Sequence, residues 1–153
     1  MNRINSFTDL EVYKSSYELM TIVHRQILPL LPEEEKYNLK DQLNRSTKAI
    51  PRLIAEGFAK RHQVRGFQKY LYDALAEDNE TIVGISQIRD LYCPPVDKVL
   101  CDDIIDRYDK VARQTYKLMQ AWDSFKRADK PETNSVTNRE TELTNNEQWK
   151  PKI

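Results

Sequence analysis

Apolar residues recur along most of the chain at alternating intervals of three and four, the spacing of helices that bury one face. The first run lies within residues 8–29, and Pro29 and Pro32 predict its end. Thr8 and Glu11 have the spacing of a capping box, which predicts the start of the helix. The positions predicted to face the core are Leu10, Tyr13, Tyr17, Met20, His24 and Ile27.

A second helix is predicted to begin near the acidic stretch 33–35, whose charges suit the positive end of a helix dipole. Pro51 lies inside this run and opposes the carbonyl of Thr47, so we expect a kinked helix that nevertheless continues. The predicted core positions are Leu39, Leu43, Ser46, Ile50, Leu53 and Gly57.

Two further helices follow the same spacing. A turn at 61–66 precedes the third helix, Cys93-Pro94-Pro95 closes it, and Asp97 is the expected N-cap of the fourth. The third is predicted to bury Phe67, Leu71, Ala74, Asp78, Ile82 and Ile85. The fourth is predicted to bury Leu100, Ile104, Tyr108, Val111, Thr115, Leu118, Trp122 and Phe125.

Four amphipathic helices joined by short loops pack most simply as an antiparallel, up-down-up-down four-helix bundle. We therefore expect an all-α domain at residues 1–127. The apolar spacing stops after it, and the polar residues 128–153 are predicted to form a disordered tail. Trp149 in this tail is either an idle aromatic residue or a docking residue.

Composition agrees with helix: the chain has three glycines, and 31% of its residues are charged. No apolar stretch reaches the length of a membrane span, and the first residues lack the apolar core of a signal peptide, so we expect a cytoplasmic protein that binds no membrane. Cys93 and Cys101 form neither a CxxC motif nor a secreted disulfide framework, and are interpreted as ordinary thiols.

The sequence argues against common catalytic and metal sites. Neither of the two histidines, His24 and His62, belongs to a Glu-x-x-His motif or to the Arg-to-His motif of helical ribonucleases, and no Gly-rich phosphate loop is present. We therefore expect no enzyme activity, metal or cofactor. His24 is interpreted as a core histidine instead of a catalyst. Asp78 and Glu56 are interpreted as partners of arginines or of local networks, the alternative being a buried acid–base pair.

Charge is strongly segregated although the chain is neutral overall. Residues 36–72 carry a net charge of +7 and residues 73–109 a net charge of −7. The basic positions singled out are three on one face of the second helix and four around the following turn: Arg45, Lys48, Arg52, Lys60, Arg61, Arg65 and Lys69. Such a cluster fits nucleic-acid phosphates, the acidic surface of another subunit, or simple solvation.

Three segments resemble the bacterial four helix bundle protein family, also called the 23S rRNA intervening-sequence proteins. They are 7–13, 37–57 and 67–80, and the resemblance extends over roughly residues 7 to 120. The most recognisable motif consists of Ile50, Pro51, Ile54, Ala55, Glu56 and Gly57. This chain differs from the usual family pattern at Asn44, Ala49 and Leu53.

The resemblance implies a homo-oligomer, commonly a pentamer, without known catalytic activity. Some relatives are encoded inside ribosomal RNA genes, and a related branch comprises accessory proteins of diversity-generating retroelements that bind a reverse transcriptase. The residues suggest that the motif is architectural, because Gly57 permits close helix approach and Glu56 suits an ion pair with Arg45 or Arg52 of a neighbour.

The sequence thus predicts a non-enzymatic homo-oligomeric scaffold that binds RNA or an RNA-handling protein through its basic face. The alternatives are a purely structural self-assembling protein, in which the basic and acidic segments meet between subunits, and an accessory protein of a reverse transcriptase.

Overall fold

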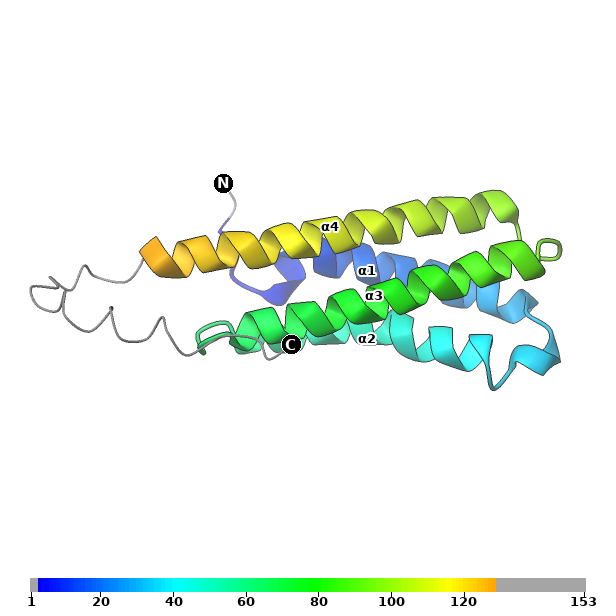
Figure 1. Ribbon diagram of the computed structural model, residues 1–153, viewed down its shortest axis with the longest axis horizontal. Helices are drawn as coiled ribbons and strands as arrows, with labels where there is room; N and C mark the ends of the chain where they lie inside the picture. Colours follow the sequence, from blue (N-terminus) through cyan, green and yellow to red (C-terminus); the bar gives the residue numbers. More distant parts are fainter. Residues whose placement is uncertain (1–2, 129–153) are drawn as a thin grey trace, which may run out of the picture.

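The computed structural model describes residues 3–128, with side chains through residue 123. The predictions for the tail and Trp149 lie outside this part, as does the side chain of Phe125. Four helices form the fold, and Figure 1 shows that consecutive helices run in opposite directions. Their bounds are α1 Glu11–Ile22, α2 Leu39–Ala59, α3 Gly66–Leu91 and α4 Lys98–Ala128. The predicted all-α four-helix bundle is confirmed.

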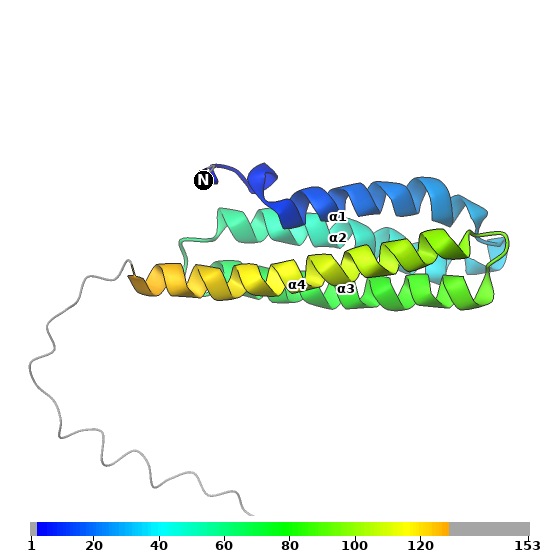
Figure 2. The same ribbon diagram turned by 90° about the horizontal axis from the view of Figure 1, so that it is seen from above.

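Each helix packs against the one before and after it, and α1 also contacts α4, so the four surround one core (Figures 1 and 2). Short turns join α2 to α3 and α3 to α4. The connection from α1 to α2 is longer and contains a π-helical turn at Val23–Ile27 and 3-10 turns at Leu28–Leu30 and Glu33–Glu35. None of the helices in residues 3–128 has the length and apolarity needed to cross a membrane.

The predicted capping box at Thr8 and Glu11 is wrong. Ser6 and Asp9 form the box instead: the Asp9 carboxylate accepts from the Ser6 backbone N–H at 3.0 Å, and the Ser6 hydroxyl accepts from the Thr8 N–H. This box caps a 3-10 turn at Phe7–Asp9, and α1 begins after it at Glu11. Glu11 instead pairs with Lys14 at 3.3 Å.

The predicted core face of the first helix is displaced in the structure. Its ends, Leu10 and Ile27, are buried, but Tyr17 is 51% exposed. Tyr13, Met20 and His24 are only half-buried. The positions that α1 and the following π-turn bury are Val12, Ser16, Leu19 and Val23. These residues have the same alternating spacing, so the first helix carries two neighbouring stripes, and only one can face the bundle.

Helix α2 follows the predicted pattern more closely. Five of its six predicted core positions are buried, while Leu53 is half-buried and Ile54 takes its place in the core. The helix begins at Leu39 because residues Glu33–Glu35 form a separate 3-10 turn. Pro51 lies inside a helix that continues on both sides, as predicted, while the expected kink stays a prediction.

The predictions for α3 and α4 also hold at most positions. Asp78 is buried as expected, whereas Ile82 is half-buried beside buried Thr81. The Asp97 carboxylate accepts a hydrogen bond from the Val99 N–H at 2.9 Å, which confirms it as the N-cap of α4. Of the predicted positions of α4, these four are buried: Ile104, Tyr108, Val111 and Thr115.

Candidate functional site

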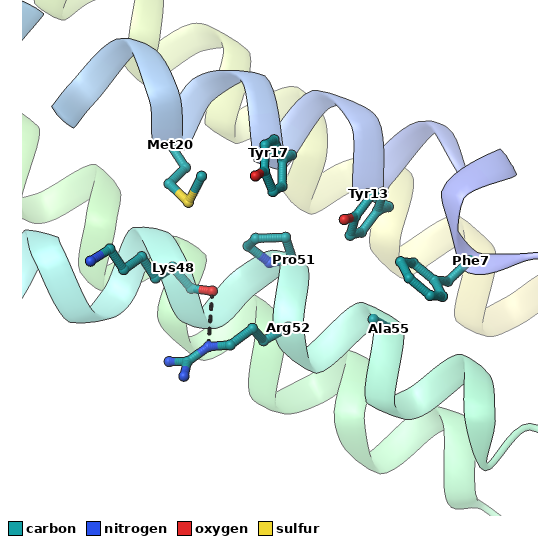
Figure 3. A pocket seen from close by; sticks show the side chains of 8 residues that line it. All are labelled: Phe7, Tyr13, Tyr17, Met20, Lys48, Pro51, Arg52 and Ala55. Atoms are coloured by element: carbon teal, nitrogen blue, oxygen red, sulfur yellow. Dashed lines mark hydrogen bonds between the residues drawn. The ribbon is translucent and has the colours of Figure 1, made fainter. Parts of the chain in front are cut away.

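A groove of about 350 Å³ runs along the outside of the bundle between α1 and α2 (Figure 3). The half-buried face of α1 forms one wall and the family-like motif of α2 forms the other. We call it the α1–α2 groove, and its lining residues are Phe7, Tyr13, Tyr17, Met20, Lys48, Pro51, Arg52 and Ala55.

Aromatic rings form the α1 wall of this groove. The Phe7 and Tyr13 ring centroids are 4.9 Å apart in an edge-to-face arrangement, and those of Tyr13 and Tyr17 are 5.9 Å apart. Figure 3 shows Met20 continuing this row. Aromatic rings that pack against one another while staying partly exposed are typical of residues that contact another molecule.

The motif of α2 serves both the core and the groove. Ile50, Ile54 and Gly57 are buried in the bundle, whereas Pro51 and Ala55 line the groove and Glu56 is exposed. A Cβ atom added at Gly57 would lie 2.7 Å from the Tyr70 Cβ, which supports the prediction that this glycine permits close helix approach. The predicted ion pair of Glu56 with a neighbour remains a prediction.

Two of the predicted basic residues form the rim of the groove. The Arg52 Nε donates to the Lys48 carbonyl oxygen at 3.3 Å, and Figure 3 shows its guanidinium pointing away from α1. In residues 3–128 neither cation makes a salt bridge. Arg45, one turn earlier, is engaged with Asp41 at 3.2 Å. The exposed face of α2 therefore offers two cations beside an apolar groove.

The other four predicted basic residues surround the connection from α2 to α3 and are called the basic turn: Lys60, Arg61, Arg65 and Lys69. Arg65 has a left-handed backbone with a φ of 58°. The Lys60 ammonium donates to the Tyr70 hydroxyl at 2.6 Å, and this bond raises the pKa of Lys60. Lys60, Arg65 and Lys69 are exposed and accessible to an anionic partner.

Arg61 differs from its three neighbours because its side chain is half-buried, whereas theirs are exposed. Its guanidinium donates to the Phe58 carbonyl at 2.8 Å and lies 4.1 Å from the centre of the Phe58 ring. Its carbonyl in turn accepts a hydrogen bond from the Trp122 indole at 3.4 Å. Arg61 therefore closes the end of α2 and ties the basic turn to α4.

His24 is half-buried and not a core residue as predicted, but its imidazole does have a polar partner inside the bundle. His24 Nε2 lies 3.0 Å from the Thr47 Oγ1. The single Thr47 hydroxyl proton is directed to the Leu43 carbonyl, so Nε2 is the donor to Oγ1. Partial burial, and then the charge of Lys48, lower the pKa of His24 and favour its neutral form.

The expectation that Asp78 pairs with an arginine or joins a local network is wrong. Asp78 is 1% exposed, and neither of its carboxyl oxygens has a hydrogen-bond partner in the described structure. Burial, reinforced by the nearby Asp109, raises the pKa of Asp78 to about 8. The carboxyl is therefore largely neutral at pH 7. Glu56 is exposed, so the two carboxyl groups occupy different environments.

Sequence reasoning missed the groove because it assigned Tyr13, Tyr17 and Met20 to the bundle core. The sequence did contain a signal for the groove. Besides the buried stripe, α1 carries a second apolar stripe shifted by one residue, and two apolar stripes on one helix indicate that the helix packs against two partners. No group of three or more His, Cys, Asp or Glu side chains suited to a metal ion occurs in residues 3–128.

Comparison with known proteins identifies one family. The model of the 23S rRNA-intervening sequence protein family matches residues 8–117, which include α1, α2, α3 and much of α4. The match therefore covers the basic turn and every lining residue of the groove except Phe7. No curated protein matches the chain.

Proposed function

Because the chain belongs to the 23S rRNA-intervening sequence protein family, we propose that it is a non-enzymatic helical subunit that assembles with copies of itself through the α1–α2 groove. The observation that carries this proposal is the second apolar stripe of α1. It places Tyr13, Tyr17 and Met20 in an outward-facing groove, where they gain little unless another surface covers them.

Charge complementarity indicates which surface of a second copy fits. The groove has a positive rim, whereas α4 presents four exposed aspartates near its beginning: Asp102, Asp103, Asp106 and Asp109. Three of them already pair with arginines of their own chain, and Asp106 makes no salt bridge in the described residues. An acidic α4 from another copy therefore suits a groove lined by Lys48 and Arg52.

The two surfaces belong to different helices, so the contact joins unlike faces. Head-to-tail contacts of this kind generate closed rings when the rotation between subunits closes. The segregated charge of a neutral chain agrees with such a design, because each subunit then supplies both a basic and an acidic face. The family resemblance implies a ring of five.

Light scattering during gel filtration, at low and high salt, tests the proposal. We expect an oligomer that weakens as salt rises, because exposed charge pairs are screened. Tyr17→Glu should dissociate it by placing a charge in the apolar groove. Tyr37→Glu is the matched control, since Tyr37 is 81% exposed and lies outside the groove.

A charge exchange sharpens the test. Lys48→Glu with Arg52→Glu should weaken assembly, and adding Asp106→Lys should restore part of it, because the exchanged charges attract again. A monomer at every salt concentration and protein concentration would contradict the proposal. Equal assembly of the Tyr17 and Tyr37 variants would show that the groove is not the interface.

The basic turn supports a second role, the binding of RNA by the assembled protein. Lys60, Arg65 and Lys69 are exposed around one short connection and lie outside the proposed groove contact. In a ring, this cluster would be repeated on every subunit, which raises affinity for a long polyanion through multivalency. A protein partner such as a reverse transcriptase remains the alternative occupant that the family resemblance suggests.

A filter-binding assay with structured RNA, repeated across salt concentrations, tests this role. Binding should weaken as salt increases, and Arg65→Glu with Lys69→Glu should reduce it while leaving assembly intact. Lys117→Glu, on α4, is a control at a similar exposed cation. Absence of binding by an intact oligomer would favour the purely structural alternative.

A further inference from the structure

The two cysteines of the chain meet at the turn between α3 and α4. Cys93 lies just after the end of α3, and Cys101 lies in the first turn of α4. Their sulfur atoms are 4.0 Å apart, which is van der Waals contact. The sequence separation of eight residues does not by itself require this contact, so the fold of the turn produces it.

The backbone around both cysteines is held by hydrogen bonds. The Tyr92 N–H donates to the Ile88 carbonyl at 2.8 Å, and the Val96 N–H donates to the Tyr92 carbonyl at 2.9 Å. On the other side, the Cys101 N–H donates to the Asp97 carbonyl at 3.1 Å. These hydrogen bonds therefore hold the backbone of both cysteines in positions where the two sulfur atoms stay in contact.

Two side-chain contacts further restrain the same end of the bundle. The Tyr92 hydroxyl donates to the Glu35 carboxylate at 2.6 Å, which joins the end of α3 to the turn before α2. Arg89 pairs with Asp102 at 3.2 Å, which joins α3 to α4 next to Cys101. Both helices are thus restrained by side-chain contacts close to the two cysteines.

The two thiols differ in exposure. Cys93 is half-buried, whereas Cys101 is fully buried. Burial, and then the neighbouring Cys93, raise the pKa of the Cys101 thiol to about 12, so it remains protonated and unreactive toward solutes. An accessible thiol beside a shielded one matches the arrangement of an attacking and a resolving cysteine.

From this geometry we propose that Cys93 and Cys101 form a reversible intramolecular disulfide when the protein meets hydrogen peroxide. The Cys93 sulfur attacks one peroxide oxygen, the O–O bond breaks, and Cys93 becomes a sulfenic acid while the other oxygen leaves as water. The Cys101 sulfur then attacks the Cys93 sulfur, and the S–O bond breaks. The released hydroxide takes the Cys101 proton and leaves as a second water.

The balance is two thiols and one peroxide yielding one disulfide and two waters. A disulfide has an S–S length of about 2.0 Å, so rotation of the two side chains must close the remaining gap. The new bond would tie the end of α3 to the first turn of α4. The α3–α4 connection would then resist opening, because the unfolded chain loses freedom when the loop is closed.

Intact mass measurement of the full chain after treatment with hydrogen peroxide tests the proposal. We expect a mass loss of about 2 Da, no thiol available to maleimide after denaturation, and full reversal by dithiothreitol. In buffer the Cys93 sulfenic acid should convert to the disulfide before dimedone traps it, whereas trapping should increase in urea, where the two sulfurs are no longer held together. The oxidised protein should melt roughly 5 °C higher than the reduced protein.

Single substitutions separate the two roles. Cys101→Ser should accumulate a dimedone-reactive sulfenic acid at Cys93, whereas Cys93→Ser should leave Cys101 unreactive in the folded protein. Cys93→Ser is the safer variant for folding, because Cys93 is only half-buried. Oxidation of wild-type Cys93 to a sulfinic acid with Cys101 still free would overturn the proposal. So would disulfide-linked dimers alone, or equal trapping of the Cys93 sulfenic acid by dimedone in buffer and in urea.

Discussion

Burial, and then the nearby carboxyl group of the buried Asp78 on α3, raise the pKa of the buried Tyr108 hydroxyl on α4. Neither group has a hydrogen-bond partner in the described structure. Two polar side chains are thus enclosed between the two longest helices without the pairing that buried polar groups usually have. Such a site lowers stability in a way that depends on pH.

The first prediction concerns that pH dependence. The pKa of Asp78 is about 8 in the folded protein, against an ordinary value of 3.8. Between these two values the folded protein holds a proton that the unfolded chain has lost. The Asp78 contribution to the free energy of unfolding therefore falls as pH rises across this window, by at most about 1.4 kcal/mol per pH unit.

Asp78→Asn removes the ionisable group and with it the pH-dependent loss of stability. The variant should therefore be more stable than wild type at pH 7.5 and should approach wild type near pH 4. Urea unfolding at several pH values measures the difference. Asp109→Asn is the control: its carboxylate is exposed and is only the second cause of the shift, so its effect should be smaller. Parallel pH profiles for wild type and Asp78→Asn would contradict the assignment.

The second prediction compares two glycines that both lie in helices. At Gly57 an added Cβ would meet the Tyr70 Cβ, which is bound to the backbone and cannot move aside. At Gly84 the nearest atom is the Leu43 Cδ2, the end of a flexible side chain. Gly57→Ala should therefore cost about 1–3 kcal/mol of unfolding free energy.

Gly84→Ala should change stability by less than about 1 kcal/mol, because the helix-propensity gain of alanine offsets a small adjustment of Leu43. Thermal and urea unfolding of both variants measure this contrast. An equal or larger loss at Gly84 would show that the close approach of α2 and α3 at Gly57 is not the limiting contact.

The third prediction concerns His24. Lys48 contributes to the lowered pKa of His24 by repelling the charged imidazolium. Lys48→Gln should therefore raise the pKa of His24 toward its ordinary value, as measured by an NMR titration of the imidazole protons. Wild-type stability should fall as pH drops through the ordinary histidine range of about 6.5, because the folded protein disfavours the charged form.

Lys40→Gln, which changes another cation of α2, should leave the His24 titration unaltered, since Lys40 is not among the causes of the shift. An unchanged titration in Lys48→Gln would mean that partial burial alone lowers the pKa.

The fourth prediction separates folding from binding within the basic turn. Arg61→Ala removes a charge-assisted hydrogen bond to the Phe58 carbonyl and a cation–π contact, and should cost about 1–3 kcal/mol of unfolding free energy. Lys69→Ala should change stability by less than about 0.5 kcal/mol, because Lys69 is exposed. Urea unfolding checks both, and equal losses would contradict a structural role for Arg61.

Most of the bundle was predictable because local spacing and burial agree. The core faces of α2, α3 and α4 follow from positions such as Leu43, Leu71 and Tyr108, each a buried residue on a regular stripe. Asp97 was predicted correctly as an N-cap because aspartate is a preferred residue directly before a helix and no competing cap lies beside it. The start of α1 was not, since Ser6 with Asp9 and Thr8 with Glu11 compete within one short segment.

The candidate site was only half predictable. The cations Lys48 and Arg52 were identified from their spacing, but the aromatic wall beside them was assigned to the core. A helix with two apolar stripes does not reveal which stripe faces its own bundle. That choice depends on how α1 is rotated against α2 and α4.

The sequence by itself determined the number of helices, the inward position of Asp78 and the membership of Pro51 in a continuous helix, because these follow from periodicity within one segment. Only the tertiary structure decided that Tyr17 lies in an outward groove, that the Arg61 carbonyl accepts a hydrogen bond from Trp122, and that the two cysteine sulfurs touch. These depend on how the helices are rotated and offset against one another. Such relations arise from packing between segments, which the pattern within any one segment does not specify.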